Sequence, residues 1–218
     1  MSAPHIVLAV LLGVGAYLLG SVPFGIVIGK GLYGIDVREQ GSGNIGTANV
    51  FRVLGYKAGV LVLIADIGKG FLPAFAAARF LPPWVAMVIG ALAVIGHMKS
   101  PFIGFRGGKG VATGAGVALG LMGPMFLLVG VAFILLVLAT RIVSVASLTA
   151  TVLFLLEVWL LHEPLVYRIA AVVLSASLFW SHRTNIGRLI HGREHRFDFH
   201  RHGKSTSTGR PDGSQVRP

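Results

Sequence analysis

Residues 56–78 read YKAGVLVLIADIGKGFLPAFAAA, an apolar run with only three charged side chains. Runs of about 17 to 25 apolar residues are long enough to cross a hydrocarbon core of about 30 Å as a helix. Over the whole chain, 54% of the 218 residues are hydrophobic and 12% are charged, and the mean hydropathy is +0.78. Because an ordinary soluble domain has about 25% charged residues, the sequence predicts an integral membrane protein.

Six further apolar runs lie on either side of this one. We divide the stretch 109–140 at Gly123-Pro124, a turn signal, and leave open a re-entrant arrangement there. The first run is too long for a signal peptide and lacks a basic leader, so we expect it to remain as a helix. The sequence therefore predicts an all-α bundle of seven transmembrane helices at 4–28, 56–78, 84–98, 109–122, 124–140, 143–161 and 165–181.

The placement of positive charge predicts the orientation of this bundle. With the N-terminus outside, residues 29–55, 99–108, 141–142 and 182–218 lie on one side of the membrane, and they hold nearly all the Lys and Arg. By the positive-inside rule that side is the cytoplasm. We therefore expect a multi-pass membrane protein with its C-terminus and its polar segments in the cytoplasm.

Composition also sets limits on partners and chemistry. The net charge is +11, but no nucleic-acid-binding motif is present, so attraction to anionic membrane lipid at about 1 kcal/mol per surface cation explains the excess better. We expect no nucleic-acid partner. The chain has no cysteine, which excludes disulfides, thiol nucleophiles and Cys-based metal sites. Residues 1–195 are expected to form one transmembrane domain, and 196–218 a basic, disordered cytoplasmic tail.

The first polar segment is Gly41-Ser42-Gly43-Asn44-Ile45-Gly46, with Arg52 shortly after it. Its glycines free the backbone to turn several N–H groups toward one point, a geometry that binds phosphate oxygens. Ser42 and Asn44 add side-chain donors, and Arg52 can supply a bidentate guanidinium. The alternative is a flexible loop with Arg52 at the membrane surface.

The second polar segment is Gly107-Gly108-Lys109-Gly110, which leads directly into the apolar run that holds Thr113. A glycine-rich loop that opens a helix favours an anion at the helix N-terminus, with the lysine as a point charge. The segment is not a nucleotide-binding P-loop, because Ile103 stands at the position of its first glycine and Gly110 follows the lysine. It predicts a phosphate site, or else a basic loop that only obeys the orientation rule.

The third polar segment begins at His182. If the last span continues as a helix, His182, Asn185 and Arg188 lie near one face of it at the membrane surface. A histidine beside an amide can bind a substrate hydroxyl or act as a general base. The alternative is an interfacial helix end whose polar side chains meet lipid headgroups.

Asp66 and Lys69 lie three residues apart inside the second predicted span. Each charge costs about 2.5–3.5 kcal/mol at the bilayer centre, so we expect the two to pair and to orient the helix. An ion or proton relay, as in a transporter, is the alternative.

Together these segments resemble the bacterial acyl-phosphate:glycerol-3-phosphate acyltransferases, from Gly20 to Glu194. Two departures are visible: the family usually has Ala-Thr-Asn where this chain has Thr47-Ala48-Asn49, and Lys where it has Arg106. The matching motifs are Gly-Ser-Gly-Asn-Ile-Gly at 41–46 with Asn49-Val50-Phe51-Arg52, Gly96-His97 leading to Pro101–Thr113, and His182–Leu189 with Gly192.

The resemblance implies a seven-helix fold and roles for particular residues. It places Ser42, Arg52 and Lys109 on the substrate phosphates and His182 and Asn185 at the glycerol end, and these five are the expected catalytic residues. The expected substrate-binding residues are Gly43, Asn44, Gly107, Gly108, Gly110, Thr113, Ser147 and Arg188.

The implied reaction passes an acyl group from a long-chain acyl phosphate to the 1-hydroxyl of glycerol 3-phosphate, giving lysophosphatidic acid and inorganic phosphate. We expect direct transfer, because Ser42 lacks an evident Ser-His-Asp arrangement; His182 or a substrate phosphate is the base. No cofactor and no metal are called for, and the soluble enzyme that makes acyl phosphate is an expected partner. The alternative is a transporter of phosphate or a phosphate ester, although the motifs cluster at one face rather than at the midplane.

Overall fold

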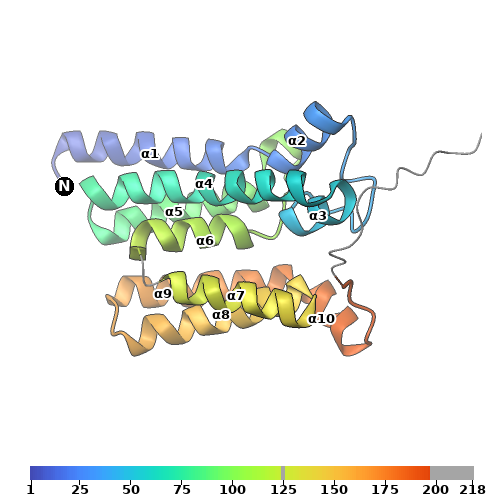
Figure 1. Ribbon diagram of the computed structural model, residues 1–218. Coiled ribbons are helices and arrows are strands. Elements are labelled where there is room, and N and C mark those ends of the chain that lie inside the picture. Colours follow the sequence, from blue (N-terminus) through green and yellow to red (C-terminus); the bar gives the residue numbers. More distant parts are fainter. Residues whose placement is uncertain (124–125, 197–218) are drawn as a thin grey trace, which may run out of the picture.

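The computed structural model describes residues 1–123 and 126–196. Within these residues the chain is helical, without β-strands, and the longer helices run side by side along a common direction (Figure 1). The elements are α1 (Ala3–Ser21), α2 (Phe24–Tyr33), α3 (Thr47–Leu54), α4 (Tyr56–Phe80), α5 (Pro83–Met98), the 3₁₀ turn η1 (Pro101–Ile103), α6 (Val111–Met122), α7 (Phe126–Thr140), α8 (Val143–Leu160), α9 (Leu165–Ser181) and α10 (Arg183–Ile190).

Only some of these helices have the length of a full membrane span. α1, α4, α5 with η1, and α8 are long and apolar enough, and α9 with α10 makes a fifth if the bent pair is counted as one. α2, α6 and α7 are apolar but shorter. The all-helical membrane architecture is therefore confirmed. Four or five of the described helices have the length of a full span, so the count of seven spans stays a prediction.

Two predicted runs differ from the helices that form. The run 4–28 is broken after Ser21, because Pro23 disfavours helical backbone at the residue before it and Val22 is extended, with φ −60° and ψ 118°. α6 begins two residues later than the run 109–122, because Gly110 adopts φ +85°. The division at Gly123 is confirmed: α6 ends at Met122, and Gly123 has φ +64°.

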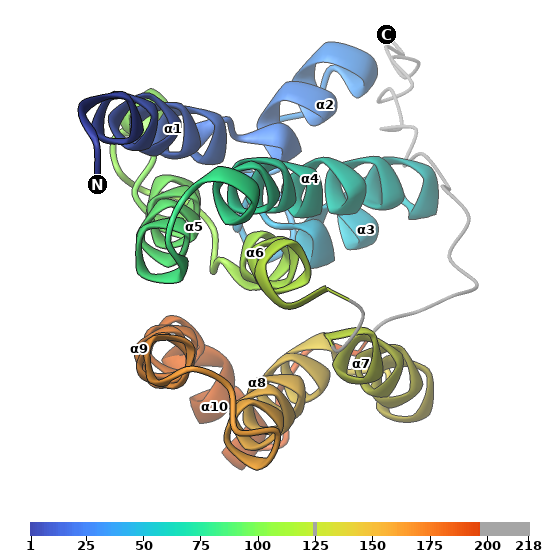
Figure 2. The ribbon, with the colours of Figure 1, turned by 90° about the vertical axis from the view of Figure 1, so that its left-hand side faces the viewer.

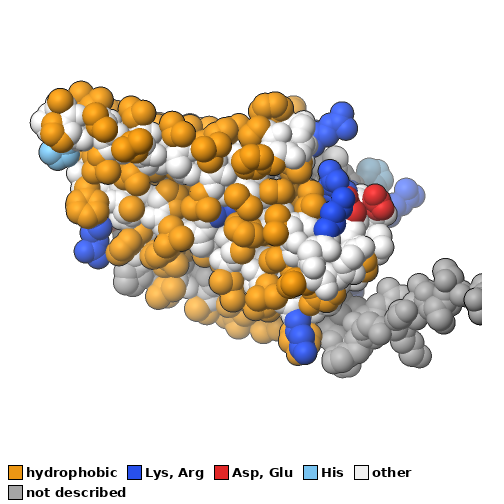
Figure 3. Space-filling view, turned by 90° about the horizontal axis from the view of Figure 1, so that it is seen from above, with side chains coloured by type: hydrophobic (Ala, Val, Ile, Leu, Met, Phe, Trp, Pro, Cys, Tyr) orange, Lys and Arg blue, Asp and Glu red, His pale blue; other side chains and the backbone are white. Residues whose placement is uncertain are grey.

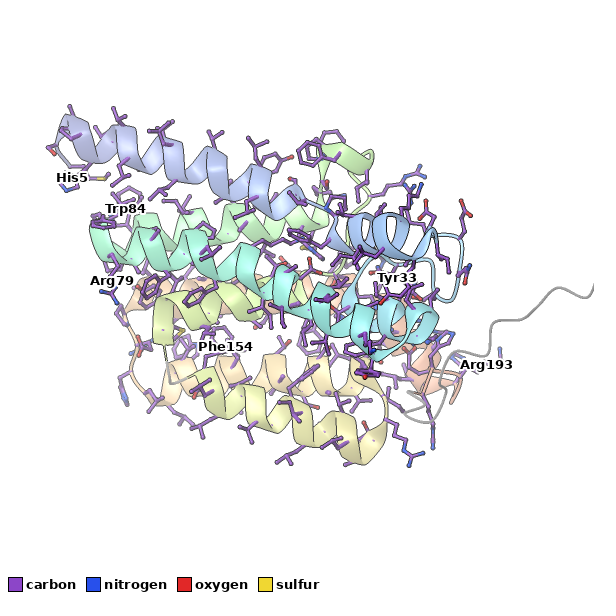
Figure 4. The ribbon with its side chains drawn as sticks, turned by 45° about the horizontal axis from the view of Figure 1, so that its top comes forward. His5, Tyr33, Arg79, Trp84, Phe154 and Arg193 are labelled. Atoms are coloured by element: carbon purple, nitrogen blue, oxygen red, sulfur yellow. The ribbon has the colours of Figure 1, made fainter. Side chains whose placement is uncertain are left out.

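The polar segments gather at one end of the helix bundle. α2, α3 and α10 lie together at the right of Figure 1, away from the N-terminus. In the space-filling view the lysines and arginines cluster mainly at this end, while hydrophobic side chains cover the length of the molecule (Figure 3). Tyr33 and Arg193 mark the same end in Figure 4, and His5, Arg79 and Trp84 mark the opposite one.

α4 is the central helix of the first half of the molecule, where it packs on α1, α5 and α6 (Figure 2). Glycines let α4 and α6 approach backbone to backbone: a Cβ on Gly70 would lie 2.1 Å from the Thr113 carbonyl oxygen, and one on Gly116 would lie 2.0 Å from that of Ile67. The predicted pairing inside α4 is confirmed, since Lys69 Nζ lies 2.7 Å from Asp66 Oδ1.

Candidate active site

Asn49, at the start of α3, organises the first polar segment. Its Oδ1 accepts the backbone N–H of Ser42 at 2.8 Å. Its amide group donates to two loop carbonyls, those of Val37 at 2.8 Å and Gln40 at 3.1 Å. Arg52, one helical turn later, approaches the same Oδ1 with Nη1 at 3.5 Å. Ser42 and Arg52 are therefore held on a common support, which the sequence analysis had not included among the site residues.

The glycines of this segment serve the turn. Gly41 and Gly43 have φ values of +61° and +69°, and a Cβ on Gly41 would lie 2.4 Å from Asn49 Oδ1. Asn44 uses its side-chain oxygen locally, because it accepts the Gly46 N–H at 2.8 Å. The Asn44 oxygen thus stabilises the loop, while Ser42 and Gly43 are exposed at its surface.

The glycine-rich loop lies flat against the end of α5. Gly107 donates its N–H to the Met98 carbonyl and Gly108 donates to that of His97, each at 3.1 Å. A Cβ on Gly108 would lie 2.2 Å from His97 Nε2, so only glycine allows this approach. These two amides therefore bind carbonyl groups of α5.

Lys109, the next residue, reaches across to the third polar segment. Its Nζ donates a hydrogen bond to Asn185 Oδ1, and its carbonyl accepts the Ser181 hydroxyl at 3.3 Å. Asn185 Nδ2 in turn donates to Glu194 Oε1 at 2.6 Å. Arg188 Nε donates to the other oxygen of Glu194 at 2.8 Å. The structure therefore joins segments more than seventy residues apart in one polar chain of contacts.

The last span does not continue straight, as the grouping of His182, Asn185 and Arg188 had assumed. α9 ends at Ser181, and α10 leaves it at an angle of 58°. Asn185 and Arg188 nevertheless share a face of α10, because both bind Glu194. His182 stands at the bend and is buried.

The surroundings of Lys109 and His182 lower the pKa of both side chains. The pKa of the Lys109 ammonium is lowered to about 8, mainly by burial; the attraction of Glu194 opposes this, and the positive charges of Arg188 and Arg52 add to it. Burial and the positive charge of Lys109 lower the pKa of His182 to about 4. His182 Nδ1 lies 2.8 Å from the Leu178 carbonyl, which can only accept, so Nδ1 carries the proton. The neutral ring therefore keeps a lone pair on Nε2.

Glu194 is a site residue that sequence reasoning missed. Burial raises the pKa of its carboxyl, but hydrogen bonds from Arg188 and Asn185 outweigh that effect and keep the pKa below its usual value. The ionised carboxylate anchors both donors. A signal was present in the sequence, because Glu194 is the only acidic residue between Pro164 and Phe197, a stretch rich in Arg and His.

Thr113 and Ser147, two further expected binding residues, lie inside the helix packing. Thr113 is fully buried, with its carbonyl and methyl against Gly70, and its hydroxyl has no hydrogen-bond partner among the described residues. Ser147 is also buried and donates its hydroxyl to the Val143 carbonyl within α8 at 2.9 Å. Gly110, at the start of α6, is buried as well.

The assembled site is cationic. Arg52, Lys109 and Arg188 influence one another electrostatically, and Glu194 is the acidic group among them. Such a group of cations with one carboxylate has positive charge left to neutralise, which suits a phosphate ester. Within residues 1–123 and 126–196, no three His, Cys, Asp or Glu side chains are grouped so that they could hold a metal ion.

Comparison with known proteins gives this geometry a family. Residues 10–192 match the family model described as glycerol-3-phosphate acyltransferase. A relative of that name from Aquifex aeolicus is 44% identical over 191 residues, which cover 87% of this chain and 99% of the relative. One from Geobacillus kaustophilus is 44% identical over 180 residues, covering 82% and 91%.

Solved structures agree. The crystal structure of PlsY (YgiH), an integral membrane glycerol 3-phosphate acyltransferase, in its glycerol 3-phosphate form superposes with a TM-score of 0.83 at 44% identity, covering 87% of this chain and 96% of that one. The lysophosphatidic acid form gives a TM-score of 0.81. The transporter alternative is thereby set aside. By sequence and by structure, the chain belongs to the glycerol-3-phosphate acyltransferase family of integral membrane proteins.

Proposed function

We propose that the protein transfers a fatty acyl group from a long-chain acyl phosphate to the 1-hydroxyl of glycerol 3-phosphate, giving lysophosphatidic acid and inorganic phosphate. The observation that carries the proposal is the contact of Lys109 with Asn185, which brings a cationic loop and the third polar segment into one site. Both substrates bear phosphate, and this accounts for the several cations gathered at one end of the bundle.

The phosphate groups are held by the cations of the site. Arg52 offers a guanidinium that lies 3.5 Å from Asn49 Oδ1, and Lys109 offers an ammonium next to the glycine-rich loop. Ser42 stands on the same support as Arg52 and can donate its hydroxyl. Because Asn185 and Glu194 hold Lys109 and Arg188 in place before substrate arrives, these cations need little rearrangement to meet an anion.

The glycerol end is bound by His182 and Asn185. His182 is neutral at physiological pH, and its Nε2 lone pair can accept a hydrogen bond from the substrate hydroxyl. A pKa of about 4 makes this imidazole a weak proton acceptor. We therefore assign it the orientation of the hydroxyl, and assign acceptance of the proton to a phosphate oxygen of the substrate.

In the transfer step the hydroxyl oxygen of glycerol 3-phosphate attacks the acyl carbon. The bond between that carbon and the phosphate oxygen breaks, and the departing phosphate takes up the proton. An acyl phosphate is a mixed anhydride with a good leaving group, so the protein contributes positioning and charge stabilisation. Lys109 stabilises the negative charge that grows on the leaving phosphate.

The location of the site fits a membrane enzyme with a soluble supply of substrate. We assign the polar end to the cytoplasm and the protein to the bacterial inner membrane, because the lysines and arginines gather at that end. In this arrangement the chain crosses the membrane seven times. α1 with α2 forms one passage, α9 with α10 forms another, and α4, α5, α6, α7 and α8 form one each. The acyl chain lies among the spans in the bilayer, and the enzyme that makes acyl phosphate delivers it from the cytoplasm.

The test is release of inorganic phosphate by the purified protein in lipid, supplied with a long-chain acyl phosphate, with and without glycerol 3-phosphate. The proposal expects release that depends on the acceptor and matches the lysophosphatidic acid formed. Transfer from acyl-CoA but not from acyl phosphate would contradict the assigned donor. Transfer of neither, in a preparation that is folded, would contradict the reaction.

A further inference from the structure

Three ionisable side chains are buried in the first half of the bundle, outside the network of Lys109 and Glu194. Asp66 and Lys69 on α4 are each 2% exposed, and His97 on α5 is 4% exposed. Lys69 Nζ lies 2.7 Å from Asp66 Oδ1, and His97 Nδ1 lies 3.8 Å from the same oxygen. Among the described residues, His97 Nδ1 makes no hydrogen bond. The reaction assigned above uses none of the three.

His97 connects this cluster to the glycine-rich loop. Its carbonyl accepts the N–H of Gly108, and the adjacent Met98 carbonyl accepts that of Gly107. Its ring lies so close under Gly108 that a Cβ there would come within 2.2 Å of Nε2. The His97 ring therefore packs directly against the loop at Gly108, the residue before Lys109.

Lys69 connects the cluster to the break between α1 and α2. Its Nζ donates to the Val22 carbonyl at 2.8 Å and lies 5.5 Å from the centre of the Phe24 ring. The following residue, Gly25, packs on the first polar segment, since a Cβ there would lie 2.0 Å from the Ile45 carbonyl oxygen. The same three side chains thus reach toward both glycine-bearing segments of the site.

Burying three ionisable side chains costs more free energy than filling the same space with apolar ones. Removing two charges from water costs several kcal/mol per ion, and a buried ion pair is often no better for stability than apolar side chains of the same volume. Buried ion pairs can nevertheless be useful when they fix one arrangement of the elements around them. Here the elements that they join are a loop and a helix break, neither of which has regular backbone bonding of its own.

We propose that His97, with the Asp66–Lys69 pair behind it, is a positioning unit that holds the loop 107–110 in register with the α1–α2 break and hence with the segment 41–46. None of the three touches substrate. The proposed consequence for the enzyme, correct placement of Lys109 on a substrate phosphate, rests on the function assigned above.

The first test compares His97→Ala with Ile89→Ala, a matched control. Ile89 is buried on the same helix, two turns earlier, in a cluster with Ala86 and Ala93. Hydrogen exchange of the loop amides and the KM values for both phosphate substrates are measured in lipid. Because a misplacement of 1 Å can cost about 100-fold, we expect His97→Ala to speed exchange at Gly107 and Gly108 and to raise one KM by about tenfold or more.

A merely structural role predicts a different pattern. Ile89→Ala should lower thermal stability but leave the exchange of the loop and both KM values within about twofold of wild type. Under the positioning proposal, by contrast, His97→Ala should change kcat per folded enzyme less than it changes the KM. Loop exchange and KM values in His97→Ala that also stay within about twofold would overturn the proposal.

Two further variants keep the test decisive if His97→Ala does not fold. His97→Gln keeps a polar side chain that extends toward Gly108, so partial recovery of the KM is expected. Asp66→Asn with Lys69→Met removes both charges together and leaves no isolated charge, and it should raise the same KM. Unchanged values in the folded double variant would remove the ion pair from the unit. Faster loop exchange with unchanged KM values would support the positioning of the loop by these side chains but contradict the assigned role of the loop in phosphate binding.

Discussion

The two halves of the molecule are built differently. In residues 1–123 the helices pack through glycines, and the three buried hydrophobic clusters of the described residues lie there, on α1, α3, α4, α5 and α6 with Val37 and Leu81. In α7 Val129 is the buried residue, and a Cβ added to Gly130 would have no atom within 4 Å. Figure 2 shows α7, α8, α9 and α10 as a separate group beside the first.

The candidate site lies where these halves meet. The tightly packed half holds the loop with Lys109 and the helix with Arg52, and the sparsely packed half supplies His182, Asn185 and Glu194. A scaffold with close backbone contacts can fix the cations to within a fraction of an ångström. The second half then closes the site through the contact of Lys109 with Asn185. Substitutions in the two halves should therefore differ in whether they damage stability or turnover.

The largest expected effect is at the contact itself. Lys109→Ala should lower kcat/KM by about 100-fold or more, comparable to the loss of one oxyanion-hole donor. The matched control is Lys99→Ala, which removes an exposed lysine ten residues earlier and should leave turnover within about twofold. Steady-state transfer assays in lipid measure both. Near-normal activity of Lys109→Ala would take this lysine out of the site.

The second prediction concerns the scaffold. Gly116→Ala places a Cβ 2.0 Å from the Ile67 carbonyl oxygen, so α4 and α6 must separate. We expect a loss of about 1–3 kcal/mol of stability, the usual cost of overpacking. Gly114→Ala, on the same helix, has no atom within 4 Å of its new Cβ and should be neutral or mildly stabilising. Thermal unfolding in one detergent compares the two, and equal melting temperatures would contradict the close packing assigned to the first half.

The third prediction concerns the sparsely packed half. Glu194→Ala leaves Asn185 and Arg188 without their shared acceptor, so the site should lose kcat/KM by about tenfold. Glu163→Ala, at the other end of α9, is the control for loss of one acidic charge. Transfer assays at fixed pH and salt give the comparison. If both variants keep wild-type turnover, Glu194 does not order the third polar segment.

The fourth prediction is a pH dependence. The pKa of Lys109 is lowered from its usual 10.5 to about 8, so the ammonium is charged below pH 8 and loses its proton as the pH rises through that value. kcat/KM should therefore fall above about pH 8, approaching tenfold per pH unit. Lys109→Arg keeps its charge, so whatever activity it retains should show no such fall. A profile of Lys109→Arg that declines like wild type would assign the ionisation to another group.

Sequence reasoning located the longer helices well because apolar runs have a direct physical cause in the thickness of the bilayer. It missed the break at Val22-Pro23, since the residues on both sides are apolar and the run reads as continuous. It also missed the bend at His182, which a local pattern of three-residue spacing conceals. Hydropathy along the sequence indicates which residues are apolar, whereas the break at Val22-Pro23 and the bend at His182 are changes in backbone conformation.

The cations of the candidate site were conspicuous in the sequence, whereas the groups that contact them were not. Arg52 and Lys109 stand beside glycines in short polar segments, and such segments are conspicuous in an apolar chain. Asn49 and Glu194 act on other protein groups, so their importance becomes visible only when their partners are placed. His97 is similar, because its contact with Gly108 joins residues that the sequence gives no reason to pair.

A double-mutant cycle between Lys109 and Asn185 tests most directly whether the two halves form one site. kcat/KM for transfer to glycerol 3-phosphate is measured for wild type, Lys109→Ala, Asn185→Ala and the double variant, each normalised to folded protein. If the residues act as a unit, the double variant should be about as impaired as the more damaged single variant, a coupling of about 0.5–3 kcal/mol. Effects that simply multiply would show that the two halves contribute independently, which contradicts the account.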